Sequence, residues 1–335
     1  MKAFILDRYR KKGALRFGDR QEPSPLPDDV VIAVRAAGLN QLDSKVRDGE
    51  FKLFLPYRMP LVLGHDVAGT VVRVGANVRR FQPGDEVYAR PRDGRIGGFA
   101  EFIAVDEADV AHKPGNIGME EAASLPLVAL TAWQALVETA TLKPGQKVLI
   151  HAGSGGVGTI AIQLAKHLGA SVATTTSTAN IDLVRSLGAD VVIDYKTQAF
   201  EDVLSGYDVV LNSLDAKTLR KSLAVLKPGG KLISISGPPD PAFARTQRLN
   251  WGLRQVMRAL SFGIRRKAKA RRIDYSFLFM RADGEQLACI ASLVEDGGIR
   301  PVLDRTFPFA QTNEAMAYLE TGRAKGKVVV TLDDA

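Results

Sequence analysis

The chain has 335 residues, of which 46% are hydrophobic and 24% are charged, a composition typical of a globular protein of about two domains. Its single cysteine, Cys289, excludes a disulfide framework and a four-thiolate structural zinc site, and it fits a reducing compartment. The net charge of +8 comes from one segment, because ten Lys and Arg against two acids lie between Asp240 and Asp274 and the other 35 basic and 35 acidic residues cancel.

The N-terminal sequence, from Met1 to Leu6, is a strand-like run without the charged and apolar regions of a secretory leader. No stretch approaches the roughly 18 consecutive apolar residues that a membrane-spanning helix needs. We therefore expect a cytoplasmic protein without a transmembrane segment.

Short β-branched runs, broken by Gly and Pro, fill roughly the first third of the chain. Residues 30–34 and 68–75 predict strands, and residues 83–88 predict a turn that leads into another strand. Several short strands with few regular helices predict a small barrel-like β domain.

Strands and helices alternate after residue 122. The predicted strands are 147–151, 171–175, 191–193, 208–211 and 231–236, and the clearest predicted helices are 158–168 and 181–187. This alternation predicts an α/β domain, a doubly wound parallel sheet with helices on both faces. A helix–strand tail follows from about residue 284.

A glycine-rich turn joins the first of these strands to its helix. Residues 153–158 read Gly-Ser-Gly-Gly-Val-Gly, the pattern in which glycines permit a tight turn and close approach of the backbone to a pyrophosphate. The helix N-terminus then supplies free N–H donors and positive dipole charge. We predict a dinucleotide site with Ser154, Gly155, Gly156 and Val157 as binding residues; the alternative is a structural turn.

The end of the second predicted strand indicates which dinucleotide binds. NAD sites usually have Asp or Glu there, to bind the ribose 2′-hydroxyl. This chain has Thr176 and Ser177 instead, and hydroxyls can donate to a 2′-phosphate without repelling it. NADPH is therefore the predicted cofactor, with Ser177 as a ligand; the alternative is that Thr176 and Ser177 only cap the next helix.

Further motifs carry a family resemblance along nearly the whole chain. They are AGLNQLD (37–43), LGHDVAG (63–69), VG (74–75), PGD (83–85), GGFAE (97–101), ASLP (123–126), LTAW (130–133), LGAD (187–190) and GRAKGKVV (322–329). Together with the glycine-rich turn they resemble the quinone oxidoreductase branch of the medium-chain dehydrogenase/reductases. Within it they are most similar to the enone and alkenal reductases and the mitochondrial reticulon-4-interacting protein type.

The resemblance implies two domains and their boundaries. A GroES-like catalytic domain would be formed by residues 1–121 and completed by the returning tail, residues 266–335. A Rossmann NADPH-binding domain would comprise residues 122–265. The resemblance also implies an active site in the cleft between these domains, and a homodimer.

Departures from the zinc-dependent relatives bear on the reaction. Those relatives carry a catalytic Cys near the position of Asn40, and His-Glu where this chain has His65 and Asp66. One His cannot hold a catalytic zinc ion, which needs three protein ligands, so we predict no metal. Without a Lewis acid to stabilise an alkoxide, reversible alcohol oxidation is disfavoured.

Reduction of a quinone or of the C=C bond of an α,β-unsaturated carbonyl needs only a placed hydride donor and hydrogen bonds to the carbonyl oxygen. We therefore predict an NADPH-dependent quinone or enone reductase with a small-molecule substrate. The alternatives are a zinc-type alcohol dehydrogenase and a non-catalytic NADPH-binding structural or nucleic-acid-associated protein.

The resemblance also indicates individual site residues. Asn40 is expected near the nicotinamide ribose or the substrate carbonyl, with a turn Asn as the alternative. Lys45 and Tyr57 are candidate proton donors because they lie near the motifs of the first domain and not because the resemblance assigns them; water is the alternative. The remaining predicted cofactor residues are Thr131, Tyr195, Asn212, Gly237, Phe279 and Lys325, of which Asn212 and Gly237 are also indicated by their position at the ends of predicted strands.

The basic segment combines an amphipathic stretch with a charge run. Leu249, Leu253, Met257 and Leu260 recur at helical spacing, and residues 265–272 read RRKAKARR. We expect a helical insertion over the cleft with a solvated basic end. A membrane surface or another anionic partner is the alternative, and nucleic acid is disfavoured because aromatic residues do not alternate with the charges.

Overall fold

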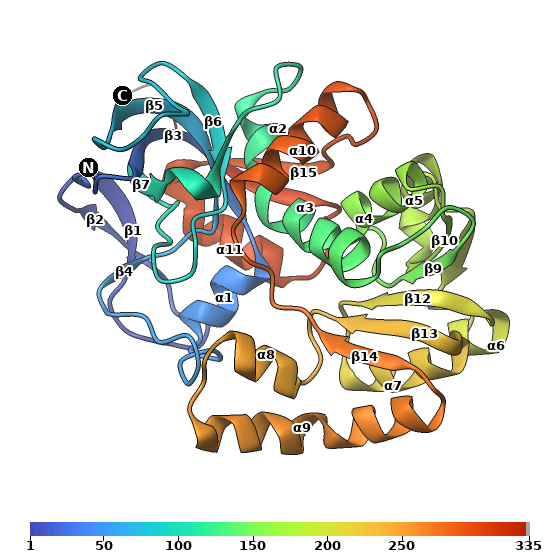
Figure 1. Cartoon of the computed structure of the whole chain (residues 1–335). Coiled ribbons are helices and arrows are strands. Elements are labelled where there is room, and N and C mark those ends of the chain that lie inside the picture. The colour runs from blue at the N-terminus through green and yellow to red at the C-terminus, as the bar shows by residue number, and fades with distance from the viewer. Residues whose placement is uncertain (333–335) are drawn as a thin grey trace. The chain divides into compact units, whose positions relative to one another are not determined.

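The computed structural model describes residues 1–332 and forms two compact units (Figure 1). Unit 1 combines Met1–Leu130 with the C-terminal segment from Arg281, and unit 2 is Thr131–Met280. The domain boundaries predicted from the sequence, after residues 121 and 265, both lie before the observed ones. The first observed boundary lies later because the Leu127 N–H donates to Asp66 of unit 1. The second lies later because residues 274–277 add a strand to the sheet of unit 2.

Unit 1 is built on β strands. Its strands are β1 (Lys2–Leu6), β2 (Arg16–Asp19), β3 (Asp29–Leu39), β4 (Leu61–Val62), β5 (Asp66–Val74), β6 (Glu86–Ala89), β7 (Phe102–Asp106), β8 (Val110–His112), β15 (Leu303–Pro308) and β16 (Lys327–Thr331). One sheet has the order β15-β16-β3-β5-β6-β8, with β7 also paired to β3, and the second has the order β2-β1-β4. The 11-residue β3 is nearly continuously buried, as its run of Val, Ile and Ala predicts.

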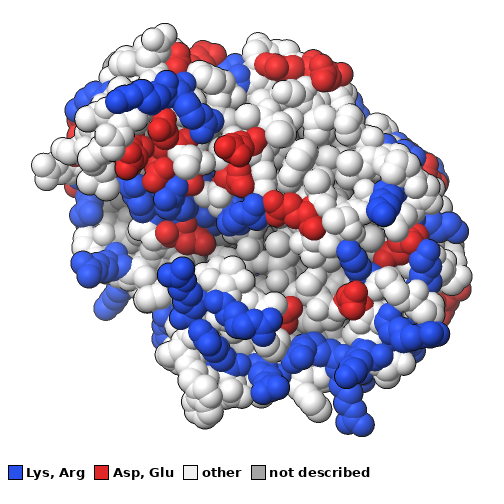
Figure 2. All heavy atoms as spheres, in the orientation of Figure 1, with Lys and Arg blue, Asp and Glu red and all other residues white. Residues whose placement is uncertain are grey.

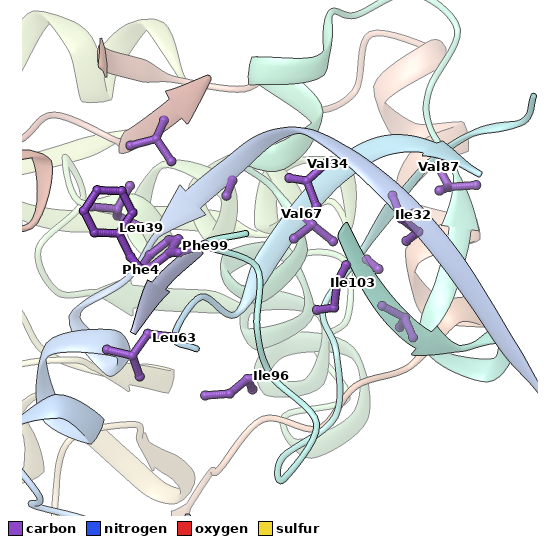
Figure 3. Packing of buried hydrophobic residues seen from close by; sticks show 14 of the residues in the cluster. Phe4, Ile32, Val34, Leu39, Leu63, Val67, Val87, Ile96, Phe99 and Ile103 are labelled. Carbon is purple, nitrogen blue, oxygen red and sulfur yellow. The ribbon is translucent and has the colours of Figure 1, made fainter. Parts of the chain in front are cut away.

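The core of unit 1 lies on these strands. Figure 3 shows side chains from β1, β3, β5, β6 and β7, and from the segments between them, converging on one another. The labelled residues are Phe4, Ile32, Val34, Leu39, Leu63, Val67, Val87, Ile96, Phe99 and Ile103. Burial of this many aliphatic and aromatic side chains holds β3 and β5 in place. Asn40 follows the end of β3, and Asp66 begins β5.

Within residues 1–332, five α-helices accompany these strands. They are α1 (Gln41–Arg47), α2 (Met119–Ala123), α3 (Pro126–Trp133), α10 (Gly284–Glu295) and α11 (Thr312–Glu320), and α3 crosses from unit 1 into unit 2. Helix α1 begins directly after β3, with Asn40 as its N-cap residue. Pairing brings the first residue of β5 and the start of β16 to the same end of β3, because Gly38 lies opposite Asp66 and Leu39 lies opposite Val328.

Unit 2 is a six-stranded sheet in which every strand is parallel to its neighbours. Its order is β11-β10-β9-β12-β13-β14, formed by β9 (Lys147–Ile150), β10 (Ser171–Thr176), β11 (Val191–Asp194), β12 (Tyr207–Asn212), β13 (Leu226–Ser234) and β14 (Asp274–Phe277). The order reverses between β9 and β12, the point where ligands bind in open α/β sheets.

Helices cover both faces of this sheet (Figure 1). The α-helices that lie wholly in unit 2 are α4 (Gly156–His167), α5 (Ile181–Ser186), α6 (Phe200–Val203), α7 (Ala216–Val225), α8 (Pro241–Thr246) and α9 (Trp251–Ala270). Apolar residues of α7 and α9, among them Leu223 and Ile264, share a buried cluster with Leu149 and Val210 of the sheet. The predicted α/β fold class, a GroES-like β domain with a Rossmann-type parallel sheet, is confirmed.

The basic segment forms α8 and α9, and its predicted apolar stripe is only partly correct. Leu249 and Met257 are buried, and Leu253 is half-buried, but Leu260 is 59% exposed. The buried residues of α9 are Met257, Ser261, Ile264 and Ala268, so the inward face is rotated away from Leu260 and is partly polar. Among residues 1–332, we find no helix with the length and apolarity required to cross a membrane.

Candidate functional site

The predicted cofactor residues of unit 2 follow the carboxyl ends of its strands. Ser154 follows β9, Ser177 follows β10, Tyr195 follows β11 and Asn212 ends β12. Gly237 comes shortly after β13, and Phe279 comes shortly after β14. Because the strands are parallel, these six positions share one edge of the sheet, the edge at which nucleotides bind in doubly wound folds.

The glycine-rich turn has the close packing that such a site requires. A Cβ atom at Gly158 would lie 2.3 Å from the Ala152 carbonyl oxygen, and one at Gly153 would lie 2.0 Å from Thr174 Oγ1. Gly155 is the N-cap of α4, so the first N–H groups of that 12-residue helix follow the turn directly. These unpaired N–H donors and the positive end of the helix dipole suit a pyrophosphate. The residues of the turn therefore fit this part of a dinucleotide.

A cluster of neutral polar groups lies at the end of β10. Thr176 Oγ1 and Asn180 Nδ2 each lie 3.0 Å from Ser154 Oγ, and Asn180 Nδ2 lies 3.3 Å from Ser177 Oγ. Asn180 Oδ1 is buried and has no hydrogen-bond partner among the described residues. The Ser154 and Ser177 hydroxyls therefore remain able to donate, and Asn180 Oδ1 remains able to accept. Tyr195, which is 62% exposed, lies at the rim of this cluster.

Asp194 is the carboxylate that approaches this cluster, and it is already engaged. It accepts hydrogen bonds from Thr178 Oγ1 and from the Lys196 N–H. These donors hold the pKa of Asp194 below its usual value, the Thr178 hydroxyl contributing most. The Asp194 carboxylate therefore accepts hydrogen bonds from groups of the protein itself. The side chains at the end of β10 carry hydroxyl and amide groups and no carboxylate.

Asn212 and Gly237 lie farther along the same edge. Asn212 is fully buried; its Nδ2 donates to the Leu214 carbonyl at 3.1 Å, and its Oδ1 has no partner in the part of the chain that the structure describes. The Gly237 N–H donates to Ser234 Oγ at 2.7 Å. Phe279 packs edge-on against Phe243, with ring centroids 5.7 Å apart, which places an aromatic wall after β14. Thr131 is buried at the start of unit 2.

In unit 1, Asn40 belongs to a buried hydrogen-bonded network. Lys327 Nζ donates to Asn40 Oδ1 at 2.6 Å, to Asp66 Oδ2 at 3.0 Å and to the Leu39 carbonyl at 2.9 Å. Asn40 Nδ2 donates to Asp66 Oδ2 at 2.8 Å and lies 3.4 Å from the Gly38 carbonyl. Both amide N–H groups of Asn40 are therefore used, and one lone pair on Oδ1 remains free.

A second buried pair adjoins this network. His65 Nδ1 lies 2.6 Å from Asp43 Oδ1, and Asp43 Oδ2 accepts from the Asn40 backbone N–H at 2.8 Å. Both side chains are almost completely buried. His65 Nε2 has no partner among residues 1–332.

The two predicted proton donors occupy different environments. Tyr57 is buried, and its hydroxyl has no hydrogen-bond partner within the described residues. Burial raises the pKa of Tyr57 well above its usual value of 10, so the phenol stays protonated at neutral pH. Lys45 is half-buried on α1, with Nζ 6.0 Å from the centre of the Phe51 ring. Lys325 is exposed before β16.

The residues around His65 do not suit a zinc ion. Among residues 1–332, no three His, Cys, Asp or Glu side chains are grouped closely enough to hold a metal. His65 Nδ1 is paired with Asp43, the amide of Asn40 is committed to Lys327 and Asp66, and Cys289 is an exposed residue of α10. A catalytic zinc needs three protein ligands, which this donor set does not supply.

Four residues of these polar groups are not among the site residues predicted from the sequence. Asp43, Asp66 and Lys327 hold Asn40, and Asn180 belongs to the cluster at the end of β10. Asp43 and Asp66 lie within the quoted motifs, and Lys327 lies two residues after the Lys325 that was named. A signal was available for Lys327, because a Lys followed by Val-Val-Val starts a buried strand and needs a buried partner.

Comparison with known proteins agrees with this architecture. Residues 26–115 match the family model of the alcohol dehydrogenase GroES-like domain, and residues 187–330 match the model described as zinc-binding dehydrogenase. The second description names a family and does not alter the ligands that this chain offers.

Relatives are similar over almost the whole chain. The NAD(P)H oxidoreductase RTN4IP1, mitochondrial, of Danio rerio is 36% identical over 99% of this chain and 91% of its own length. The NADPH-dependent alkenal/one oxidoreductase, chloroplastic, of Arabidopsis thaliana is 38% identical over 98% of this chain and 79% of its own length. The solved quinone oxidoreductase from Coxiella burnetii is 29% identical, with a TM-score of 0.85 and 99% of each chain covered. The predicted family is confirmed: the chain belongs to the quinone oxidoreductase branch of the medium-chain dehydrogenase/reductase superfamily.

Proposed function

We propose that this protein is an NADPH-dependent reductase that transfers hydride to a quinone or to the C=C bond of an α,β-unsaturated carbonyl. The observation that carries the proposal concerns Asn40, which lies at or next to the position of a catalytic Cys in zinc-dependent relatives. Its amide is held by Lys327 and Asp66 and is not available to a metal. The dinucleotide edge of unit 2 and the names of the relatives support the same reaction class.

Unit 2 would hold the cofactor along the carboxyl edge of its sheet. The α4 N-terminus, at Gly155, Gly156 and Val157, would bind the pyrophosphate. The Ser154 and Ser177 hydroxyls, which accept hydrogen bonds from Asn180 Nδ2, would donate to the 2′-phosphate, and Tyr195 would lie against the adenine end. Thr131, Asn212, Gly237 and Phe279 would contact the nicotinamide end, and Lys325 of unit 1 is the proposed further phosphate contact. When bound, NADPH supplies the hydride equivalent that the reduction requires.

Asn40 acts in this proposal by accepting a hydrogen bond. Its two N–H groups already have acceptors, so it has no donor left for a substrate carbonyl. The free lone pair of Oδ1 suits a hydroxyl donor, such as one on the nicotinamide ribose. Of the two contacts expected from the sequence, this geometry favours the ribose.

Tyr57 supplies the donor that the reduced oxygen needs. Its buried hydroxyl has no acceptor among the described residues, and its raised pKa makes it a poor source of a proton but a stable hydrogen-bond donor. A donor of this kind stabilises the negative charge that develops on an enolate or hydroquinone oxygen. The proton itself would come from Lys45 or from water.

Steady-state kinetics with a simple quinone and a simple enone test the proposal. Tyr57→Phe should lower kcat about 100-fold, the usual effect of removing one oxyanion donor, and leave NADPH affinity unchanged. Tyr318→Phe, which removes a hydroxyl bonded to Asp304 in the same unit, is the matched control and should keep wild-type kcat. Lys45→Met should slow the reaction if Lys45 is the proton source, whereas a water-derived proton predicts no change.

Two alternatives are separated by the same assays. A non-catalytic NADPH-binding protein would bind the cofactor without turnover of any quinone or enone. A zinc-type alcohol dehydrogenase would oxidise simple alcohols and lose that activity on chelation. The homodimer and the cytoplasmic location expected from the sequence are also parts of this proposal, and sedimentation analysis and cell fractionation test them.

A further inference from the structure

Helix α9 presents a face to solvent that differs from an ordinary surface helix. Its buried residues, Met257, Ser261, Ile264 and Ala268, follow one another at intervals of four, three and four residues and form one inward stripe. Most of the remaining positions are exposed, so a wide outward arc is available to a partner.

Large apolar side chains lie on that outward arc. Trp251 is 76% exposed and Phe262 is 59% exposed. They are 11 residues apart, about three helical turns, so they lie on the same line of the helix roughly 16 Å from each other. Leu260 and Val256, four residues apart, form a second exposed apolar pair on the same helix. At 3.6 residues per turn the two pairs lie roughly 150° apart around the helix, so Trp251 and Phe262 form one exposed line, and Val256 and Leu260 lie at another border of the exposed arc.

The charged side chains between Asp240 and Asp274 are all basic. From residue 241 to residue 273 there are ten Lys and Arg and no Asp or Glu. Figure 2 shows Lys and Arg gathered along the edge where Figure 1 places α9. The exposed bases of α9 are Arg254, Arg258, Arg266, Lys267 and Lys269. None of these five forms an ion pair with a carboxylate of residues 1–332, so their charge is uncompensated.

A basic hollow adjoins the carboxyl end of α9. It has a volume of about 430 Å³, and its lining includes Arg220, Lys267 and Arg271. The acid in its wall, Glu201, is paired with Lys221, so the hollow as a whole is positive. Its charge suits a phosphate group.

We propose that α9 docks this protein on an anionic phospholipid surface. The helix would lie in the plane of the surface, with Trp251 and Phe262 at the headgroup level and the surrounding bases against lipid phosphates. Aromatic side chains favour that interface, and each Lys or Arg near an anionic surface adds to the attraction. The exposure of Trp251 and Phe262, which lie on one line of α9, favours this interpretation over a purely solvated basic end.

Nucleic acid is the competing anionic partner, and it explains less. Phosphate contacts would use the bases of α9, but a duplex backbone would offer no apolar surface to Trp251 and Phe262. The docking proposal does not depend on the proposed reductase activity. If both hold, the surface would bring the enzyme to substrates dissolved in the lipid.

Co-sedimentation with vesicles tests the proposal on the full chain without cofactor or substrate. Wild type should bind vesicles of phosphatidylcholine with about 30% phosphatidylglycerol, whose surface is negatively charged, and should not bind pure phosphatidylcholine. Arg258→Gln/Arg266→Gln/Lys269→Gln should weaken binding about 100-fold, or about fivefold for each base removed. The matched control is Arg8→Gln/Arg10→Gln/Lys11→Gln, which removes the same charge from exposed positions of unit 1 and should bind as wild type within about twofold.

The apolar contribution is tested separately. Trp251→Ser/Phe262→Ser should weaken vesicle binding at least about tenfold while leaving the thermal melt unchanged, because both side chains are exposed. Wild-type tryptophan emission should shift to the blue on anionic vesicles, and this shift should vanish in Trp251→Ser. Equal weakening by the unit 1 control, binding that ignores Trp251 and Phe262, or tighter binding to a DNA duplex than to vesicles would each overturn the proposal.

Discussion

Lys327 Nζ lies 3.0 Å from Asp66 Oδ2 in the interior of unit 1, and this buried ion pair holds the side chain of Asn40 from two sides. Asp66 is fully buried, and it also accepts a hydrogen bond from the Leu127 N–H at 2.7 Å. The pair therefore connects β5, β16, the start of α1 and the start of α3. It fixes the orientation of the amide on which the proposed ribose contact depends.

Removing one member of the pair should be costly. Lys327→Met leaves the Asp66 carboxylate buried without its cation, and we expect the free energy of unfolding to fall by about 3–5 kcal/mol. Urea denaturation measures this loss. Lys327→Met/Asp66→Asn should recover part of it, because the remaining amide is neutral.

Lys325→Met is the matched control for that pair. Lys325 is exposed two residues earlier, and its replacement should change stability by less than about 0.5 kcal/mol. Equal stability of Lys327→Met and wild type would contradict the role given to the pair.

The strand–helix alternation of unit 2 could be predicted closely from the sequence. The helix predicted at 181–187 is α5, Ile181–Ser186, and the strand predicted at 171–175 is β10, Ser171–Thr176. Local periodicity and the glycine-rich turn specify these elements over short stretches of chain. The proposed cofactor residues at strand ends come from the same pattern, since parallel strands align their carboxyl ends.

The network around Asn40 could not be predicted in the same way. Asp66 and Lys327 are separated by 261 residues, and they meet because β16 and β5 pair with opposite edges of β3. A single sequence does not reveal such long-range register. The outward position of Leu260 was missed for a related reason: helical spacing gives the period of a stripe, but the sheet and α7 decide which face of α9 is buried.

The donor set around His65 leads to a prediction about metal. The purified protein should contain far less than one zinc ion per chain, because three protein ligands are not grouped in residues 1–332. Elemental analysis measures the metal content, and quinone reduction should persist after dialysis against a chelator. A zinc-dependent alcohol dehydrogenase treated in parallel should lose activity. Stoichiometric zinc whose removal stops turnover would show that another ligand arrangement forms.

His151 should give the stability of the protein a pH dependence. It is buried at the end of β9, where Nδ1 contacts Thr175 Oγ1 at 3.1 Å and Nε2 contacts Ser222 Oγ at 2.9 Å. Burial lowers the pKa of His151 from 6.5 to about 4. Between these values the unfolded chain binds a proton that the folded protein does not, so stability is present above pH 6.5 and is lost as the pH falls.

The expected loss is about 2 kcal/mol between pH 7 and pH 5, measured by urea denaturation. His151→Gln should be less stable at pH 7 but should lose about 2 kcal/mol less than wild type over this interval. His167→Gln, which removes an exposed imidazole from α4, should keep the wild-type profile. A His151→Gln profile parallel to that of wild type would show that His151 does not cause the dependence.

The polar cluster at the end of β10 predicts a preference for NADPH. Ser154 and Ser177 offer hydroxyl groups there, positioned by Asn180 Nδ2, and the nearby Asp194 is already bonded to Thr178 and to the Lys196 N–H. NADPH should therefore bind at least about tenfold more tightly than NADH, a difference of ~1.4 kcal/mol. Fluorescence titration of each cofactor measures the two dissociation constants, and equal constants would contradict the assignment of this cluster to the 2′-phosphate.

An acid introduced into the cluster should reverse the preference. Ser177→Asp places a carboxylate at the end of β10, where it would repel a 2′-phosphate and accept a hydrogen bond from a 2′-hydroxyl. NADPH affinity should fall at least about tenfold, while NADH affinity is kept or improved. Ser186→Asp adds the same charge at an exposed position of α5 and should leave both affinities near wild type. Because the two variants share their net charge, a fall in NADPH affinity that occurs only in Ser177→Asp locates the 2′-phosphate beside Ser177, whereas an equal fall in both reflects the overall charge of unit 2.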